Sequence, residues 1–429
     1  MKKNIIFFLF NLVLFLNFAS CDTTEPPVDG NALALKLEDV SCTEAWITLT
    51  TNLTLPTTVT LKQNNQTKST INLGSADTLL YINSLMPNTN YNFQVSGTQS
   101  LALSNVVNLT TLDTTSNNFS WQSWTFGENG SSVLNDVAII DENNIWAVGK
   151  IYMNDSLGQP DPHAYNAVHW NGSEWELKRI YYYGNCSAVE YPPLRAIWAF
   201  SGNNIVVTNG GSIGWFDGNT VNLDCRVNSL LTGAVTKIWG SSINDLYIVG
   251  DNGNIVHYNG SSWTKIESGT DVDIQDIWGI TNNNNDNFIL CAASSAIGPG
   301  EHKILRISNS NSVDTISWIS NLRVHSVWMD SKYQLFACGD GMFIKSLNLW
   351  KKQEEITPVF KERIRGNSKN DLFLVGSYGL LAHYNGVSWK EYPEASAALV
   401  YTSLDIENNL MVTVGYTQRQ AVIQFMRRN

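Results

Sequence analysis

The sequence is poor in charged residues and in long apolar runs. Charged residues make up 15% of the 429 residues, against roughly 25% in an average globular protein. Beyond residue 20, no long apolar stripe follows the spacing of an amphipathic helix. Gly, Asn, Ser, Thr and aromatic residues fill the composition, and they are typical of short strands and turns. We therefore predict an all-β chain beyond residue 20.

Basic residues are particularly scarce. The chain has 27 Lys and Arg against 38 Asp and Glu, for a formal net charge of −11. Nucleic-acid-binding surfaces depend on clustered Lys and Arg, so we expect no nucleic-acid partner. The length exceeds what one ordinary hydrophobic core serves, and two or more domains are therefore expected.

The first twenty residues have the pattern of an export signal. Lys2-Lys3 precedes an apolar stretch over residues 5–18, and Ala19-Ser20 then supplies small residues before Cys21. A positive start, an apolar centre and small residues at the cut are typical of secretory signals. The stretch is shorter than the roughly 20 apolar residues that a spanning helix needs.

Small residues directly before Cys21 resemble the lipobox of bacterial lipoproteins. The resemblance implies that residues 1–20 are removed and that Cys21 becomes the acylated first residue, with ordinary secretion as the alternative. Residues 21–32, which include Pro26-Pro27, have no strand pattern and are predicted to form a tether. These features predict attachment to the membrane through a lipid in the bacterial cell envelope. Asp22 directly after Cys21 resembles an inner-membrane retention signal of some Gram-negative bacteria, so the inner membrane stays open as the alternative to the outer membrane or cell surface, which we favour.

Residues 33–112 carry a motif of all-β sandwich domains. The segment over residues 85–95 reads L-x-P-x-T-x-Y-x-F-x-V, which resembles the tyrosine corner of fibronectin type III domains. The resemblance implies that the Tyr91 hydroxyl bonds to the backbone at the start of the motif, while Phe93 and Val95 point into a sandwich core. We expect a β-sandwich that acts as a spacer.

Residues 117–429 are repetitive. Three segments (169–175, 257–263 and 383–389) share the pattern H-x-N-G-x-x-W, with an Asn-Gly turn between two strands, a strong hairpin signal. A second unit, an apolar residue before Trp, lies upstream of them. Aligning it gives seven equivalent positions: Ala138, Trp198, Trp239, Trp278, Trp328, Arg365 and Asp405. Units of roughly 40 residues with four short strands are propeller blades, so we predict a seven-bladed β-propeller.

The last repeat lacks its outermost strand. A strand pattern at 119–126, before the first repeat, is predicted to supply it and so to remove the open sheet edge. The repeats resemble bacterial propeller repeats with a W-G-S-x-N-D signature, often found beside fibronectin type III domains. This resemblance implies an architecture and no defined activity.

No motif in the chain indicates catalysis or a cofactor. His169, His257 and His383 occupy one repeat position, so they are spread around the ring and are predicted to be structural. His163 and His302 have no spaced partner, and we predict neither a metal site nor a cofactor. No nucleophile elbow or phosphate loop is present, and no catalytic residue is predicted. The alternative is a glycan-cleaving hydrolase or lyase, because two carboxylates meeting in the channel would suffice.

Cysteine positions allow one disulfide. Cys186 and Cys225 each follow an outer-strand segment in neighbouring blades, and an exported protein meets an oxidising compartment. A bond between them is therefore possible. Cys291 and Cys338 fall on apolar strands and are predicted to be free and buried.

The longest insertions all lie in connections that open on one propeller face. They are Lys150–Ala164, Tyr181–Pro193 and Ala293–Lys303. Tyr is favoured at recognition surfaces, and aromatic rings beside carboxylates also suit a sugar ring. The ligand-binding candidates are Tyr152, Asp155, Asp161, His163, Tyr181, Tyr182, Tyr183 and Tyr191. We predict a binding module for an extracellular glycan or protein; the alternative is that these tyrosines only cover the rim of the sheet.

Overall fold

A computed structural model describes residues 32–98, 102–282, 286–296, 300–308, 311–319, 321–392 and 398–429. Over this part of the chain the regular structure consists of strands β1 to β35 and two short 3₁₀ segments, and the all-β prediction is confirmed. None of its helices is long and apolar enough to cross a membrane. The predicted signal at residues 1–20, Cys21 and all of the tether up to residue 31 lie outside the described residues.

The N-terminal strands form two sheets, and β3 pairs antiparallel with both β4 and β6. The strands are β1 (Leu33–Val40), β2 (Ala45–Thr51), β3 (Thr57–Gln63), β4 (Gln66–Leu73), β5 (Asp77–Ile82), β6 (Asn90–Gly97) and β7 (Val107–Thr110). One sheet has the order β1-β2-β5 and the other has the order β4-β3-β6-β7.

The interactions predicted for the tyrosine motif are present. The Met86 N–H donates to the Tyr91 hydroxyl at 2.9 Å. Phe93 and Val95, on the following strand β6, are both fully buried. Since side chains alternate along a strand, residues two apart share the buried face, which is the pattern the motif predicts.

Residues 119–428 form seven four-stranded sheets in the described chain. The first contains β9 (Val133–Asp141), β10 (Asn144–Ile151), β11 (Tyr165–Trp170) and β12 (Trp175–Lys178). The second contains β13 (Ala196–Ser201), β14 (Asn204–Thr208), β15 (Ile213–Phe216) and β16 (Val221–Asp224), followed by the 3₁₀ segment η1 (Cys225–Leu230). The third contains β17 (Val235–Ser242), β18 (Asp245–Gly250), β19 (Ile255–Tyr258) and β20 (Trp263–Lys265).

The remaining sheets repeat this pattern. The fourth contains β21 (Ile274–Thr281), β22 (Asn287–Ser294), β23 (His302–Ile307) and β24 (Val313–Ile316). The fifth contains β25 (Val324–Trp328), β26 (Gln334–Gly339), β27 (Met342–Ser346) and β28 (Leu349–Lys352). The sixth contains β29 (Lys361–Ser368), β30 (Asp371–Gly376), η2 (Ser377–Gly379), β31 (Leu381–Tyr384) and β32 (Trp389–Glu391). The seventh contains β33 (Val400–Glu407), β34 (Leu410–Tyr416), β35 (Ala421–Arg428) and β8 (Phe119–Phe126).

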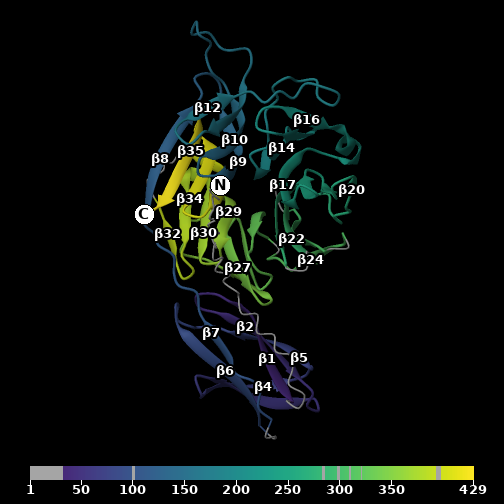
Figure 1. The fold of residues 1–429 in the computed structure, drawn as a ribbon, viewed down its shortest axis with the longest axis vertical. Coiled ribbons are helices and arrows are strands. Elements are labelled where there is room, and N and C mark those ends of the chain that lie inside the picture. Colours follow the sequence, from purple (N-terminus) through teal and green to yellow (C-terminus); the bar gives the residue numbers. More distant parts are fainter. Residues whose placement is uncertain are drawn as a thin grey trace, which may run out of the picture. The chain divides into compact units, whose positions relative to one another are not determined.

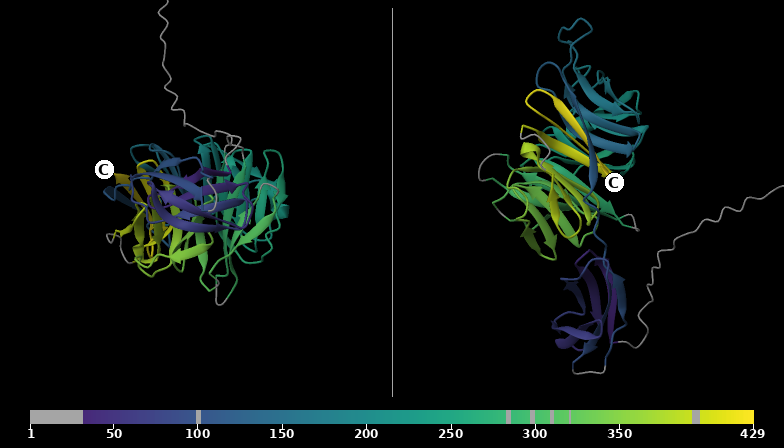
Figure 2. Two further views of the ribbon diagram at one scale, coloured as in Figure 1. Left: turned by 90° about the horizontal axis from the view of Figure 1, so that it is seen from below. Right: turned by 90° about the vertical axis from the view of Figure 1, so that its left-hand side faces the viewer.

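The seven sheets are arranged around a common centre, as in a propeller (Figure 1 and Figure 2). The first strands of the sheets pack on one another in chain order, and β33 of the last sheet packs on β9 of the first. The larger of the two compact units of the chain contains all seven sheets. Each of the seven aligned repeat positions lies on one of these innermost strands.

The prediction that a strand from before the first repeat completes the last sheet is confirmed. Strand β8 pairs antiparallel with β35, with Phe126 opposite Ala421 and Phe119 opposite Arg428. The Trp124 ring lies 4.9 Å from the Phe425 ring, and this contact adds apolar packing to the backbone ladder. The outer edge of β35 is therefore covered.

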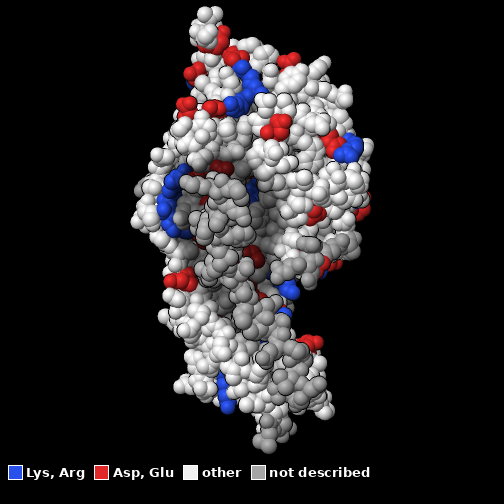
Figure 3. Space-filling model, viewed as in Figure 1, with Lys and Arg blue, Asp and Glu red and all other residues white. Residues whose placement is uncertain are grey.

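Charged side chains are sparse on the surface. The face drawn in Figure 3 is mostly white, with scattered red and blue positions, as the composition leads one to expect. Several charged residues of the propeller-like region are instead buried at its centre.

Candidate functional site

The connection between β12 and β13 folds as a small hairpin. The Tyr182 N–H donates to the Glu190 carbonyl at 2.7 Å, and Gly184 pairs with Ser187 near the tip. Extended backbone directs alternate side chains to opposite sides. Tyr181 and Tyr183 accordingly share one side and are 50% and 56% exposed.

Tyr182 points the other way and corrects the sequence-based expectation that it lies at a binding surface. Its side chain is fully buried, and its hydroxyl donates to the Val207 carbonyl at 2.7 Å and the Ser212 carbonyl at 3.2 Å. Burial raises the pKa of the hydroxyl. Tyr182 therefore anchors the hairpin to the second sheet. Because side chains alternate along extended backbone, three consecutive tyrosines cannot all face the same side.

Two of the predicted insertions meet in one aromatic surface. The Tyr181 ring lies 5.8 Å from Tyr191 and 6.3 Å from Tyr183. The His163 ring, from the insertion between β10 and β11, lies 5.7 Å from Tyr191. We call these four residues (His163, Tyr181, Tyr183 and Tyr191) the aromatic rim.

The other predicted ligand residues have local structural contacts. Asp161 forms an ion pair with Arg179, and the His163 N–H donates to the Asp161 carboxylate at 2.9 Å. Asp155 accepts two backbone N–H groups of its own loop, each at 2.9 Å. The Tyr152 ring lies beneath the Lys150 ammonium at 4.6 Å. Asp161 therefore positions His163, and the hydrogen bonds of Asp155 stay within its own loop. The Tyr152 backbone instead bonds to the segment before β9: its N–H donates to the Ser132 hydroxyl at 3.0 Å, and its carbonyl accepts the Glu128 N–H at 2.8 Å.

A disulfide joins the tip of the hairpin to the next segment of the chain. Cys186 is bonded to Cys225, with 5.4 Å between the Cα atoms. Cys225 begins η1, directly after β16. The bond and the buried Tyr182 hold the hairpin at two points. Because a held loop loses little freedom when it binds, the rim is preorganised. Cys291 and Cys338 are free and buried.

A second cluster of functional-type residues lies at the centre of the ring. Six polar residues project from innermost strands, and we call them the central cluster: Asp136, Lys237, Asp276, Ser326, Arg363 and Ser403. Each precedes an aligned repeat position by two residues, so both point to the same side of the strand. Aligning only the seven repeat positions in the sequence missed these polar residues. They can be found in the sequence by examining the residue two positions before each aligned position.

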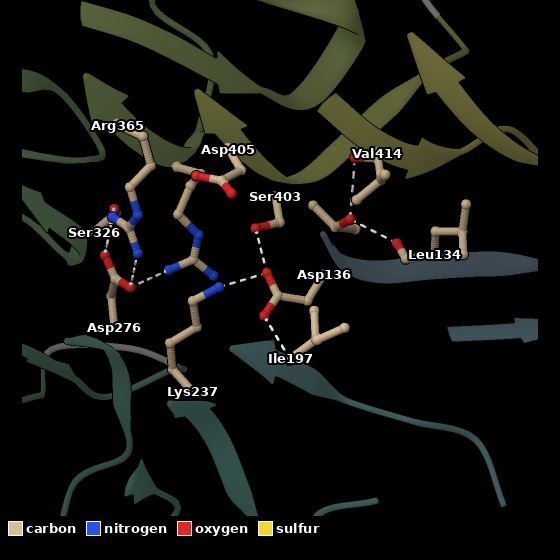
Figure 4. Close-up of polar contacts among 12 residues, drawn as sticks. Leu134, Asp136, Ile197, Lys237, Asp276, Ser326, Arg365, Ser403, Asp405 and Val414 are labelled. Carbon is tan, nitrogen blue, oxygen red and sulfur yellow. Dashed lines mark hydrogen bonds and ion pairs between the residues drawn. The ribbon is translucent and has the colours of Figure 1, made fainter. Parts of the chain in front are cut away.

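The carboxylates of the central cluster are each bound by cations from other sheets (Figure 4). Asp136 pairs with Lys237 and accepts the Ser403 hydroxyl at 2.7 Å. Asp276 pairs with Arg363 at 2.5 Å and with Arg365 at 2.6 Å.

Buried charges in such contacts connect one sheet to another. The side chains that form these contacts are all nearly or fully buried: Asp136, Lys237, Ser403, Asp276, Arg363 and Arg365. Burial alone would raise the pKa of Asp276, but Arg363 and Arg365 hold it well below its usual range. These pairs connect the innermost strands across the ring, because each partner comes from a different sheet than the carboxylate it binds.

Asp405, on β33, is in a different situation. It accepts backbone N–H groups from Ile139 at 2.8 Å and Ile406 at 2.9 Å, and no ion pair reaches it from the described residues. Burial raises its pKa to about 6. A cavity of about 240 Å³ is lined by Asp405, Glu407, Trp198 and Trp278, among others. Burial and the nearby Asp141 carboxylate also raise the pKa of Glu407.

Each of the three repeat histidines bonds within its own sheet, and His383 also bonds to the Asn117 side chain at 2.6 Å. His169, His257 and His383 contact Asn144 at 3.0 Å, Asp245 at 2.7 Å and Asp371 at 2.9 Å. The partner is in each case the first residue of the second strand of the sheet. In the described part of the chain, no group of three or more His, Cys, Asp or Glu side chains is placed to hold a metal ion.

Comparisons with known proteins show the fold alone. No protein-family model and no curated sequence matches the chain. The structure titled "YCF48 bound to D1 peptide" is similar over 72% of this chain and 95% of its own, with 13% identity and a TM-score of 0.51. YCF48 from Cyanidioschyzon merolae covers 72% of this chain and 98% of its own, with 11% identity and a TM-score of 0.51.

A WD40 protein gives a similar result. The WD40 β-propeller domain of Doa1 matches 73% of this chain and 98% of its own, with 14% identity and a TM-score of 0.53. The predicted propeller fold is thereby confirmed, while these identities carry no statement about activity.

Proposed function

We propose that the chain is a bacterial cell-envelope lipoprotein whose propeller binds a partner protein through the aromatic rim without transforming it. The observation that carries the proposal is the exposure of Tyr181 and Tyr183 on a hairpin held by Tyr182 and a disulfide. Exposed, rigid aromatic groups supply large contact area at low entropic cost.

The proposed architecture consists of an anchor, a tether, a spacer and a binding domain. Acylated Cys21 is the anchor, residues 21–32 are the tether, and residues 33–112 are a fibronectin type III-like spacer. A seven-bladed propeller follows over residues 117–429. The lipobox-like residues, the Tyr91 hydrogen bond and the seven four-stranded sheets support this assignment.

A protein partner suits the rim better than a sugar. Val189, on the same hairpin, is 55% exposed, and Leu157, on the neighbouring insertion, is 82% exposed. Apolar side chains beside tyrosines are typical of protein interfaces. One of the similar propellers is titled as bound to a peptide, which adds support for a polypeptide ligand.

The rim is tested by affinity capture from envelope extracts followed by titration of the captured protein. Tyr181→Ala combined with Tyr183→Ala is expected to weaken binding by more than about tenfold, as loss of interface anchors does. Tyr378→Ala is the matched control, because Tyr378 is 69% exposed and lies on η2, outside the rim. Undiminished binding by the double variant would contradict the proposed site.

The anchor is tested separately by cell fractionation. Cys21→Ser removes the acylation site, so the variant is expected to leave the membrane fraction or to accumulate as an uncleaved precursor. Membrane partitioning equal to that of the wild type would show that lipid at Cys21 is not the anchor.

A second candidate function is glycan cleavage in the central cavity. Asp405 and Glu407 line this cavity together, and the pKa of each is raised, as a general acid requires. Release of reducing ends from a polysaccharide by the wild type, abolished in Asp405→Asn, would favour the enzyme. Absence of release by the wild type would favour the binding module.

A further inference from the structure

A groove lies between the second and third sheets, outside both the aromatic rim and the central cluster. Its volume is about 650 Å³. Its lining includes Asn185, Trp215, Asn222, Arg226, Asn244 and Tyr258. They come from the hairpin tip, from three strands, from η1 and from the turn between β17 and β18, so the groove exists only once both sheets are formed.

Two aromatic rings from neighbouring sheets lie together in the groove. Trp215, on β15, and Tyr258, on β19, have ring centroids 5.4 Å apart and are tilted by 55°. Both are partly exposed. An aromatic face carries partial negative charge, and the C–H face of a sugar ring carries partial positive charge. Tyr258 also packs on Trp263, with ring centroids 4.9 Å apart, and lies under the Arg226 guanidinium at 5.8 Å. Trp215 is therefore the ring that offers a face to a pyranose, and Tyr258 supports it.

Four side-chain amides line the groove, and that of Asn204 already donates to Ser201 and Asn203. Asn185, Asn222 and Asn244 are exposed, and over the described chain no protein group bonds to their side-chain amides. Each amide offers two donors and one acceptor oxygen. A sugar hydroxyl likewise donates and accepts, so amides satisfy neighbouring hydroxyls without any charge.

Among the described residues that line the groove, Arg226 is the one cation, and its charge is already neutralised. Arg226 donates to the Asp224 carboxylate from Nε at 2.9 Å and from Nη2 at 2.6 Å, and Trp263 Nε1 donates to it at 2.9 Å. Burial alone would raise the pKa of Asp224, but the hydrogen bonds from Arg226 and Trp263 lower it to about 2. The pair stays ionised and internally balanced, which favours a neutral ligand over an anion.

The walls of the groove are fixed before any ligand arrives. Arg226 also donates from Nη1 to the Ser261 carbonyl at 2.8 Å, across to the third sheet. Cys225 lies in the wall and is bonded to Cys186, next to Asn185. A site held in this way loses little conformational entropy on binding.

We propose that this groove binds a neutral oligosaccharide, with Trp215, supported by Tyr258, as the stacking ring and Asn185, Asn222 and Asn244 as hydroxyl ligands. It is a site distinct from the protein-binding rim, with which it shares only the hairpin that carries Asn185. The two sites together describe a module that contacts a glycan and a protein from adjacent surfaces.

The test is isothermal titration of the full chain with neutral hexasaccharides: cellohexaose, xylohexaose, laminarihexaose, mannohexaose and maltohexaose. At least one is expected to bind with a dissociation constant below about 1 mM. Trp215→Ala is expected to weaken that binding by more than about tenfold. Asn222→Ala and Asn244→Ala are each expected to weaken it about three- to tenfold, the equivalent of one hydrogen bond.

Controls separate the groove from the fold and from the rim. Trp215 also packs against buried residues, so Trp215→Phe, which keeps a ring, should recover part of the affinity. The two Asn variants change exposed side chains, so their melting temperature is expected to equal that of the wild type. Tyr183→Ala, at the rim, should bind the sugar as the wild type does. Failure of the wild type to bind any of the five sugars, or undiminished binding by Trp215→Ala and Asn222→Ala, would overturn the proposal without affecting the rim.

Discussion

The central cluster and the aromatic rim reverse the usual placement of side chains. At the centre, Asp276, Arg363 and Arg365 are charged yet buried. At the rim, Tyr181 and Tyr183 are large and aromatic yet about half exposed. Burying charges is costly unless each is paired, and exposing aromatic rings forgoes burial energy.

The difference between the two regions separates stability from binding. Both carboxylates of the central cluster have their partners inside the protein, so this cluster has little capacity left for a ligand. In the rim, the centroids of neighbouring rings lie 5.7–6.3 Å apart. Tyr181 and Tyr183 remain about half exposed, so they are accessible to a partner. We therefore expect changes at the centre to act on unfolding and changes at the rim to act on affinity.

The largest expected effect comes from removing the carboxylate of Asp276. Asp276→Ala leaves the Arg363 and Arg365 guanidinium groups buried without their counter-ion, and loss of one partner of a buried pair costs about 3–5 kcal/mol. Urea unfolding should show this loss. Asp314→Ala is the control, since its pair with Arg306 is about half exposed and such pairs contribute less than about 1 kcal/mol. Equal effects of both variants would show that the central cluster is not a stabilising device.

The disulfide at the hairpin is expected to have the next largest effect. Replacing both Cys186 and Cys225 with Ser opens a loop of 39 residues, and the free energy of unfolding should fall by about 2–4 kcal/mol. Because the hairpin carries the rim, affinity for the partner should also fall. Addition of a reductant should destabilise the wild type and leave the double variant unchanged; a reductant effect on the double variant would point to another cause.

Local patterns allowed most of the fold to be predicted. The Asn-Gly hairpins and the spacing of roughly 40 residues predicted the propeller, and the strand β8 was predicted at its observed bounds. The motif around Tyr91 predicted a hydrogen bond between its hydroxyl and the backbone near Leu85, and the observed bond is to the neighbouring Met86 N–H. These features depend on residues close in sequence or on a repeated spacing, both of which are visible in one chain.

The sites were less predictable because their residues meet only in the folded ring. Asp276 and Arg365 are 89 residues apart, and Asp136 and Lys237 are 101 residues apart. Three of these residues lie two positions before aligned repeat positions and Arg365 is itself an aligned position, but no local pattern shows which of them pair. The prediction of Tyr182 as a ligand residue was wrong for another reason: the connection that carries it is an extended hairpin that buries every second side chain, not an irregular loop.

Asp405 differs from Asp136 and Asp276, because among the described residues no cation pairs with it. Its pKa is raised to about 6, above roughly 3.9 in the unfolded chain. The protonated form is favoured by folding, so its contribution is full below about pH 4 and is lost as pH rises through about 6. The free energy of unfolding of Asp405→Asn, relative to that of the wild type, should therefore rise by about 2–3 kcal/mol as the pH increases from about 4 to about 8. Unfolding curves across that range measure the gain, and a pH-independent difference would contradict the raised pKa.

The smallest expected effect is a difference in stability between variants of two adjacent tyrosines in the hairpin. Tyr182→Phe removes the hydroxyl that donates to Val207 and Ser212, and a buried carbonyl left without its donor costs about 1–2 kcal/mol. Tyr183→Phe removes a hydroxyl from a side chain that is 56% exposed, so the free energy of unfolding should change by less than about 0.5 kcal/mol. Thermal unfolding of the two variants, which differ by one position and carry the same chemical change, measures the contrast. If Tyr182→Phe were as stable as Tyr183→Phe, the hydroxyl of Tyr182 would not anchor the hairpin, and the rigidity of the rim would rest on the buried ring and the disulfide.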